Sequence, residues 1–144
     1  MHILIRTDLE IALLEEGLAV KDLPGEWNLR YQQLLGVQPA CDAEGCLQDV
    51  HWSEGLFGYF PSYLLGHLIS AQLSEAMEGE IGSPEKHISA GDVTPMLGWL
   101  RQNVHGVGRA LNAEDLVQQV TGRPLDSAAF LRHLTSKLNR LAML

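Results

Sequence analysis

Residues 61–79 read PSYLLGHLISAQLSEAMEG, a long apolar-periodic stretch in a chain of 144 residues. Proline stands at its first position, where the missing N–H costs nothing and the fixed φ suits a helix start. Apolar side chains then recur at helical spacing, from Leu64 through Leu68 to Met77. The stretch predicts a helix of about four to five turns that ends near Gly79.

Two further helices are predicted on the N-terminal side of this run. Residues 2–17 end at a glycine and carry four apolar residues at helical spacing, which are Ile5, Leu9, Ala12 and Leu13. Residues 21–36 begin with Asp22-Leu23-Pro24, which suits a helix start, and end at Gly36. Arg6 and Glu10 lie four positions apart in the first of these helices. We expect them to form a surface ion pair worth roughly a few tenths of a kcal/mol.

Three more helical stretches follow, at residues 94–104, 113–121 and 127–144. Asn112 is the expected N-cap of the second, with acidic residues in the first turn that complement the helix dipole and Gly122 as its stop. Asp126 is the expected cap of the third. The chain is therefore predicted to be all-α, with about six helices in a single domain that spans residues 1–144.

The composition supports a soluble globular protein, since 46% of the residues are hydrophobic and 19% are charged. A net charge of -8 argues against nucleic acid as a partner, because binding to phosphates needs clustered Lys and Arg. No apolar run approaches the roughly 20 residues that span a bilayer, so no membrane association is expected. The N-terminus reaches Asp8 and Glu10 without forming an apolar signal-peptide core, which predicts a cytoplasmic location.

Cys41 and Cys46 are the only cysteines, and they lie in a loop-like stretch. A disulfide between them is geometrically feasible but is not expected in a reducing cytosol. A structural zinc site needs four ligands, and no second Cys or His pair follows at a suitable spacing. We interpret them as two ordinary thiols.

The helical period is lost between residues 37 and 60, where Gly, Asp and aromatic residues are concentrated. This irregular segment separates the second and third predicted helices. The pattern also allows a short β-hairpin around residues 52–57. Because loops carry function more often than helices do, this segment is the most informative part of the chain.

Residues 45–52 spell the pattern G-x-x-Q-D-x-H-W, and residues 58–66 read GYFPSYLLG. Together these two blocks resemble the thermostable carboxypeptidase (carboxypeptidase Taq) family of zinc metallocarboxypeptidases. The resemblance extends back to residue 2 and forward to about Gln72, and beyond Glu80 it rests on length and helical pattern. It implies that the chain corresponds to the C-terminal part of such an enzyme, whose members are roughly three times as long.

In that family the metal is held by an H-E-x-x-H helix and a Glu on a following helix. Two histidines at i and i+4 face a metal together, and the Glu between them serves as general base. The six histidines here are at positions 2, 51, 67, 87, 105 and 133, so no two are four apart. We therefore expect no metal site in this chain, with zinc or cobalt in the full-length enzyme. Without a metal to activate water, the chain alone is expected to be inactive.

The resemblance also assigns roles within the irregular segment. His51 would bind the substrate or stabilise the transition state, while Gln48 and Asp49 orient the loop and Trp52 fixes it. Tyr59 and Tyr63 are the candidates for a phenol that donates a hydrogen bond to the oxyanion formed when the peptide carbonyl is attacked.

Each of these residues also has a purely structural interpretation. His51 beside Trp52 is typical of a packed loop histidine, although the surrounding motif favours a functional role. Tyr59 and Tyr63 are equally compatible with core aromatics. For Gln48 and Asp49, hydrogen bonding to loop backbone is the more common use of such residues.

Two functions of different classes remain in view. The chain is either a C-terminal fragment of a metallocarboxypeptidase that acts on peptide C-termini, or a free-standing helical interaction module derived from that fold. If the chain is a fragment, the helices that would have packed on the missing part leave apolar surface exposed, which favours self-association, so we expect a homodimer. A hydrolase built on Ser or Cys finds no support, because the chain has no G-x-S-x-G motif.

Overall fold

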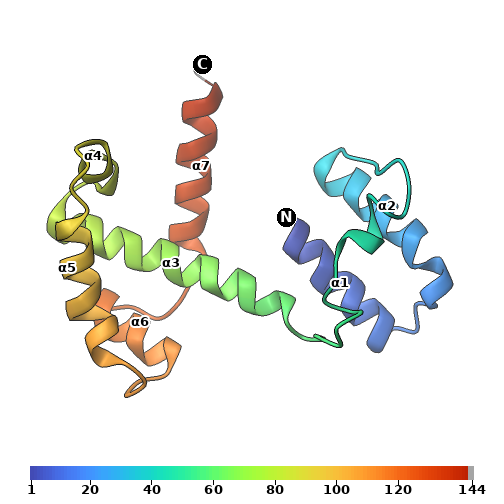
Figure 1. Ribbon diagram of the computed structural model, residues 1–144, viewed down its shortest axis with the longest axis horizontal. Coiled ribbons are helices and arrows are strands. Elements are labelled where there is room, and N and C mark those ends of the chain that lie inside the picture. Colours follow the sequence, from blue (N-terminus) through green and yellow to red (C-terminus); the bar gives the residue numbers. More distant parts are fainter. Residues whose placement is uncertain (143–144) are drawn as a thin grey trace. The chain divides into compact units, whose positions relative to one another are not determined.

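The computed structural model describes residues 1–142, and within them the chain forms seven α-helices, three short 3-10 helices and no strand (Figure 1). The prediction of an all-α protein is confirmed. The α-helices are α1 (His2–Leu14), α2 (Leu23–Leu35), α3 (Phe60–Ile81), α4 (Pro84–Ser89), α5 (Thr94–Asn103), α6 (Ala113–Thr121) and α7 (Ala128–Ala142). The 3-10 helices are Val20–Asp22, Cys46–Gln48 and His105–Val107.

Local sequence signals account for most of the helix boundaries. Gly36 ends α2 and Gly122 ends α6, each with a left-handed backbone at φ 67° and 73° that suits glycine. The Asn112 side chain caps α6 by accepting a hydrogen bond from the Asp115 N–H at 2.8 Å. Asp126 accepts one from the Ala128 N–H at 2.7 Å, as expected of the cap of α7. The predicted extension of that helix through residues 143–144 lies outside the described residues.

Four details differ from the predictions. The third predicted helix is longer than expected, since α3 runs from Phe60 past Gly79 to Ile81. The first helix ends at Leu14, three residues before Gly17, whose left-handed backbone at φ 79° redirects the chain. The short helix α4 was not predicted, since six residues are too few to show a helical period. Residues 52–57 form consecutive turns in place of a hairpin, with the Leu56 N–H donating to the His51 carbonyl at 2.8 Å.

The chain divides into two compact units, Met1–Leu65 and Gly66–Leu144, with the boundary inside α3. In the first unit α1 packs against α2 as a helical hairpin, and the irregular loop lies over the pair (Figure 1). Its core consists of four buried residues from both helices and the loop, which are Ile5, Leu9, Trp27 and Cys46. The loop that carries the family motif is thus anchored in the core of its own unit.

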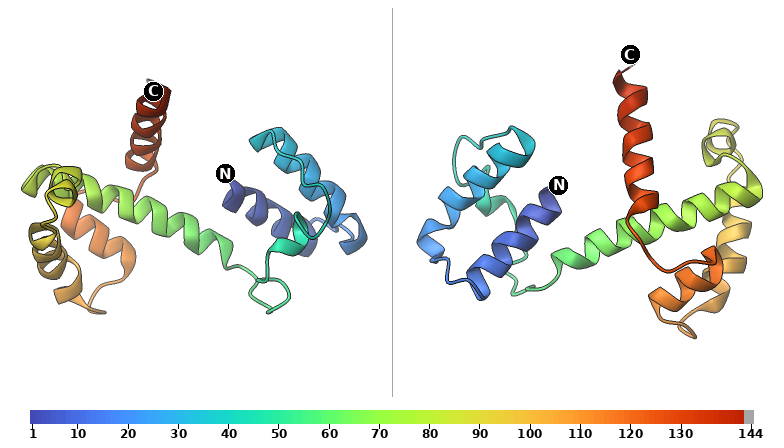
Figure 2. Two further views of the ribbon diagram at one scale, coloured as in Figure 1. Left: turned by 45° about the horizontal axis from the view of Figure 1, so that its top comes forward. Right: turned by 180° about the vertical axis from the view of Figure 1, so that it is seen from behind.

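The second unit contains the remainder of α3 with α4 to α7, and α7 rises steeply from α3 in both views of Figure 2. Its buried residues include Met77, Trp99, Val117 and Ala129. Gln72 of α3 is fully buried, and its Oε1 accepts a hydrogen bond from the Asp126 N–H. Its Nε2 lies 3.0–3.3 Å from the Thr121 hydroxyl at the end of α6 and from the Arg123 and Pro124 carbonyls of the loop that follows. That the two units form a single domain stays a prediction.

Among the described residues, none of the helices combines the length and the apolar character that crossing a bilayer requires. The longest helix, α3, has 22 residues but carries Glu75, Glu78 and Glu80 along its second half.

Candidate functional site

Asp49 is the centre of the hydrogen-bonded network in the first unit. Its Oδ2 accepts a hydrogen bond from Arg6 Nε at 2.6 Å, and its Oδ1 accepts one from the His51 N–H at 3.0 Å and another from His51 Nδ1. The Asp49 side chain is only 8% exposed. Burial alone would raise its pKa, but the hydrogen bonds from His51 and Arg6, together with the Arg6 charge, outweigh burial and hold the pKa below its ordinary value. Asp49 is therefore an ionised carboxylate.

The ionised state of Asp49 fixes the orientation of the His51 ring. A carboxylate only accepts hydrogen bonds, so His51 Nδ1 must carry the proton that it shares with Asp49. In the neutral ring, Nε2 is then an acceptor, and it lies 3.0 Å from the Tyr63 hydroxyl. Tyr63 therefore donates to His51 while the ring is neutral, and the direction reverses when the ring is protonated.

Three aromatic rings surround the His51 imidazole. The centroids of Phe60, Tyr59 and Tyr63 lie 4.9, 5.5 and 5.7 Å from it. Phe60 is buried, whereas the two tyrosines are 44% and 41% exposed and contact each other edge to face. The phenols are thus at the surface of the unit, with Phe60 beneath the imidazole.

Arg6 connects this site to the core. Its Nη1 donates to the Tyr31 hydroxyl at 2.8 Å and lies 2.8 Å from His2 Nδ1, while the guanidinium stands 5.0 Å from the centre of the Trp27 ring. Trp27 and Tyr31 stack one helical turn apart on α2, with centroids 4.7 Å apart. Burial raises the pKa of Tyr31 in spite of the Arg6 charge, so its hydroxyl stays protonated.

The predicted surface pair between Arg6 and Glu10 was wrong. Arg6 bonds to Asp49, and Glu10 is 5% exposed and accepts hydrogen bonds from Trp52 Nε1 at 2.9 Å and from the Gly58 N–H. An i,i+4 pair forms when both side chains turn toward solvent. Here the loop covers that side of α1 and supplies partners for both charges.

A cavity of about 170 Å³ opens beside the network. It is lined by His2, Ile3, Arg6, Asp49, His51, Phe60 and Tyr63. Three of the predicted site residues, Asp49, His51 and Tyr63, thus line one small recess, with Tyr59 against the His51 ring.

The other two predicted residues serve the loop. Gln48 Nε2 donates to the Ala43 carbonyl at 3.0 Å, which is the backbone role given above as its more common use. Trp52 packs edge to face against Trp27 and Phe60 and bonds to Glu10. Sequence reasoning missed Arg6 and Glu10 as part of the site. Their only signal was their position beside the buried residues Ile5 and Leu9 on α1.

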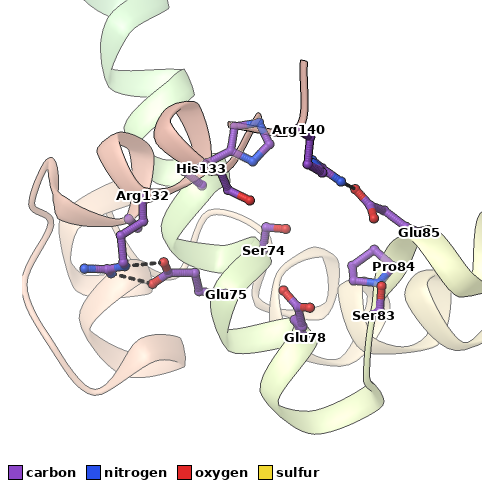
Figure 3. A pocket seen from close by; sticks show the side chains of 12 residues that line it. Ser74, Glu75, Glu78, Ser83, Pro84, Glu85, Arg132, His133 and Arg140 are labelled. Atoms are coloured by element: carbon purple, nitrogen blue, oxygen red, sulfur yellow. Dashed lines mark hydrogen bonds and ion pairs between the residues drawn. The ribbon is translucent and has the colours of Figure 1, made fainter. Parts of the chain in front are cut away.

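A larger cleft of about 410 Å³ lies in the second unit between α3, α4 and α7 (Figure 3). Arg132 bonds to both oxygens of Glu75 at 2.8 and 2.7 Å, and Arg140 bonds to Glu85. The hydrogen bond from Arg132 is the main reason that the pKa of Glu75 lies below its ordinary value. Glu78 also lines the cleft, so three carboxylates lie beside these two arginines and His133 (Figure 3).

Neither recess contains the donor set of a metal site. Within residues 1–142 no group of three or more His, Cys, Asp or Glu side chains is placed to hold an ion. The residues that the structure describes therefore do not by themselves provide the ligand set for the zinc of a metallopeptidase.

Comparison with known proteins identifies the family of the chain. Residues 1–138 match the family model of the carboxypeptidase Taq (M32) metallopeptidases. The chain belongs to this family. The recognition made from the G-x-x-Q-D-x-H-W motif is thereby confirmed.

Individual M32 relatives agree with the family match. The chain is 39% identical over 144 residues to carboxypeptidase 1 of Bacillus subtilis and 42% identical over 137 residues to thermostable carboxypeptidase 1 of Thermus thermophilus. It covers 29% and 27% of those proteins, while 100% and 95% of the chain itself is aligned. The chain thus spans less than a third of the curated M32 relatives that it matches.

Solved structures show the same fold for this portion. The M32 carboxypeptidase from Deinococcus radiodurans superposes with a TM-score of 0.89 at 35% identity, over 99% of this chain and 29% of its own. Metallocarboxypeptidase 1 of Trypanosoma cruzi superposes with a TM-score of 0.85 at 35% identity, over 92% of this chain and 28% of its own.

Proposed function

We propose that this chain is the C-terminal part of a metallocarboxypeptidase, forms the substrate-facing wall of its active-site groove and does not hydrolyse peptides by itself. The observation that carries the proposal is the ordered chain of contacts from Arg6 through Asp49 and His51 to Tyr63, in a segment that matches the M32 family along residues 1–138. Such a network holds an imidazole and a phenol in fixed directions, as a substrate-binding wall requires. Peptides with a free C-terminal carboxylate are the proposed substrates of the whole enzyme.

The roles of the individual residues follow from their hydrogen-bonding capacity. A protonated His51 presents Nε2–H as a donor, and Asp49 balances its charge. The Tyr63 hydroxyl can donate its proton to a ligand whenever it is not donating to His51, and Tyr59 stands beside it as a second phenol. These donors suit the oxyanion that develops on a peptide carbonyl under attack or the C-terminal carboxylate itself. Asp49 and Arg6 orient His51 and do not contact substrate in this proposal.

The metal of the complete enzyme has to be bound by residues outside this chain. Zinc, or cobalt in its place, is the metal we propose, on the basis of the family resemblance. The 144 residues contain no H-E-x-x-H sequence, so no step of the reaction is assigned to a metal here.

The test uses the whole chain and two peptides that differ only at the C-terminus. A blocked dipeptide with a free carboxylate is expected to shift the NMR signals of the His51 and Tyr63 side chains, and its amidated counterpart to leave them in place. No release of the C-terminal residue is expected in zinc-containing or cobalt-containing buffer. Equal shifts with both peptides would refute the substrate-wall role, and metal-dependent hydrolysis that survives repurification would refute the inactivity.

A second candidate function, a helical interaction module, is favoured by the outer face of α7. Leu131, Leu134, Leu138 and Leu141 follow a 3-4-3 spacing that places them on one face, and their exposed fractions are 56, 38, 65 and 58%. The opposite face carries Arg132 and Arg140, which bond to Glu75 and Glu85 (Figure 3). The usual arrangement of an amphipathic helix is thus reversed, with the leucines outward.

We propose that this leucine face pairs with a second copy of the chain. Four partly exposed leucines offer less than the roughly 800 Å² per partner of a standard interface, so a weak homodimer is expected. Light scattering at increasing concentration should show reversible dimerisation that Leu138→Ser weakens and that Leu29→Ser, on the exposed side of α2, leaves unchanged. A monomeric mass at high micromolar concentration would contradict the proposal.

The cytoplasm is the proposed location. Cys41 is exposed and Cys46 is buried, and both are free thiols, the form that a reducing compartment maintains. Burial raises the pKa of Cys46, which disfavours its reactive thiolate form. Fractionation of the native host with an antibody against the chain would check the location, and recovery outside the cytoplasm would contradict it.

A further inference from the structure

Glu10 is a buried carboxylate that the proposed substrate contacts do not use. It is 5% exposed and lies on α1 in the first unit. Burying a charged group is costly unless hydrogen bonds satisfy it. Here both oxygens are used, since Oε2 accepts from Trp52 Nε1 at 2.9 Å and Oε1 accepts from the Gly58 N–H.

The two donors flank the turns that separate His51 from α3. Trp52 follows His51 directly, and Gly58 directly precedes Tyr59. Gly58 has φ 73°, a left-handed conformation that suits glycine, and its N–H points to a carboxylate that lies 48 positions earlier in the sequence. A single side chain thus fixes both ends of the segment from Trp52 to Gly58.

Arg6 lies one helical turn before Glu10 and holds Asp49. Helix α1 therefore holds the loop at three positions, which are Asp49, Trp52 and Gly58. His51 lies between the first two of these positions, while Tyr59 and Phe60 follow the third. His51 precedes the turns and Tyr59 and Phe60 follow them, and the His51 ring contacts both of these rings.

We propose that Glu10 is a positioning residue, which sets the distance between His51 and the Tyr59–Tyr63 pair by fixing Gly58. The proposal deepens the substrate-wall function and rests on it for its biological meaning. A carboxylate suits the task because it accepts hydrogen bonds and donates none, and the loop presents two donors to it.

Glu10→Gln is the matched test, because it keeps the volume and removes one acceptor oxygen. Its NH2 group would face either the Trp52 indole N–H or the Gly58 N–H. The bond from Gly58 is weakened in both cases, because the Gly58 N–H then faces a donor or a neutral oxygen in place of a carboxylate oxygen. Glu16→Gln, at an exposed position just beyond α1, is the control. In the folded protein at 25 °C we expect Glu10→Gln to speed hydrogen exchange of the Gly58 amide by at least about tenfold. The His51 and Tyr63 ring signals should move with it, while the α2 amides keep their protection.

Two results would overturn the proposal. One is unchanged Gly58 exchange with unchanged His51 signals in Glu10→Gln. The other is an equal loss of protection in α2 and the loop, which would give Glu10 a general role in stability only. These measurements use no peptide. A negative result would therefore contradict the positioning role of Glu10 without contradicting the substrate-wall function, which the peptide titration tests separately.

Trp52→Phe is a second variant that tests the proposal if Glu10→Gln does not fold. It removes the indole donor and leaves the bond from Gly58 to Glu10 in place. We expect the Gly58 amide to stay protected and the contact between His51 and Tyr63 to persist. Loss of the His51–Tyr63 contact with Gly58 still protected would overturn the assignment to Gly58.

Discussion

In each of the two units a buried polar side chain binds one of the loops, and the two side chains differ in kind. Glu10 of the first unit is a carboxylate that accepts from two donors. Gln72 of the second unit is an amide whose Nε2 lies within hydrogen-bonding distance of the Thr121 hydroxyl and the Arg123 and Pro124 carbonyls, and its Oε1 accepts from the Asp126 N–H.

The difference follows from what each loop presents. The loop beside α1 turns N–H donors inward, and its aromatic and imidazole side chains lie at the unit's surface. The loop between α6 and α7 turns carbonyls inward and joins two helices, with no histidine or tyrosine between residues 121 and 128. A charged side chain is thus buried beside the loop that carries the proposed site, and a neutral amide is buried beside the loop that joins two helices. The stability of the first unit should consequently fall more than that of the second unit when a charged partner is removed.

Loss of the cation beside Asp49 should have the largest effect. Arg6→Met leaves a buried carboxylate without its charged partner, which we expect to cost about 3–5 kcal/mol in the first unit. The matched variant Arg132→Met breaks an ion pair at the solvent-exposed surface and should change the stability of the second unit much less. Native-state hydrogen exchange of α1 and of α7 measures the two units separately. Equal losses from the two variants would remove the contrast between the units.

Loss of the buried amide should have an intermediate effect. Gln72→Leu keeps the approximate size but leaves the inward-facing loop groups without a partner, at an expected cost of about 1–3 kcal/mol. Hydrogen exchange of the Asp126 amide, which donates to Gln72, reports this directly. A cost as large as that of Arg6→Met would mean that charge is not what distinguishes the two units.

The smallest effect should appear in acid. The pKa of Asp49 is lower in the folded protein than the ordinary value of 3.8, so its contribution to stability is complete above that value and is lost as the pH falls through the folded pKa. Stability of the first unit should therefore decline as solutions are acidified below about pH 4, and Asp49→Asn should flatten this decline. The measurement is the urea concentration at which the first unit unfolds, determined by hydrogen exchange at a series of pH values below about 4. An unchanged acid slope in Asp49→Asn would show that other carboxylates govern it.

Much of the helical framework was predictable because its signals are local. The bounds of α6 follow from Asn112 and Gly122, and α2 ends where Gly36 predicts. The helix α4 was missed because its six residues contain no full apolar repeat.

The site was predictable only as far as the motif reached. His51, Asp49, Tyr59 and Tyr63 lie within fifteen consecutive positions, so the family pattern names them together. Arg6 lies 43 positions before Asp49, and Glu10 lies 42 and 48 positions before its two partners. Seen along the chain, Arg6 and Glu10 have the spacing of an ordinary surface pair. Only the tertiary fold shows that the loop supplies their partners.

The orientation of the His51 imidazole is the most direct test of the account. Long-range proton–nitrogen NMR correlations on the uniformly labelled chain, recorded in alkaline solution where the ring is uncharged, report which ring nitrogen carries the proton. The network predicts a proton on Nδ1, bonded to Asp49, and an unprotonated Nε2 that accepts from Tyr63. A proton on Nε2 would contradict this assignment, because Asp49 would then not hold the ring and the proposed substrate-facing wall would lose the group that orients it.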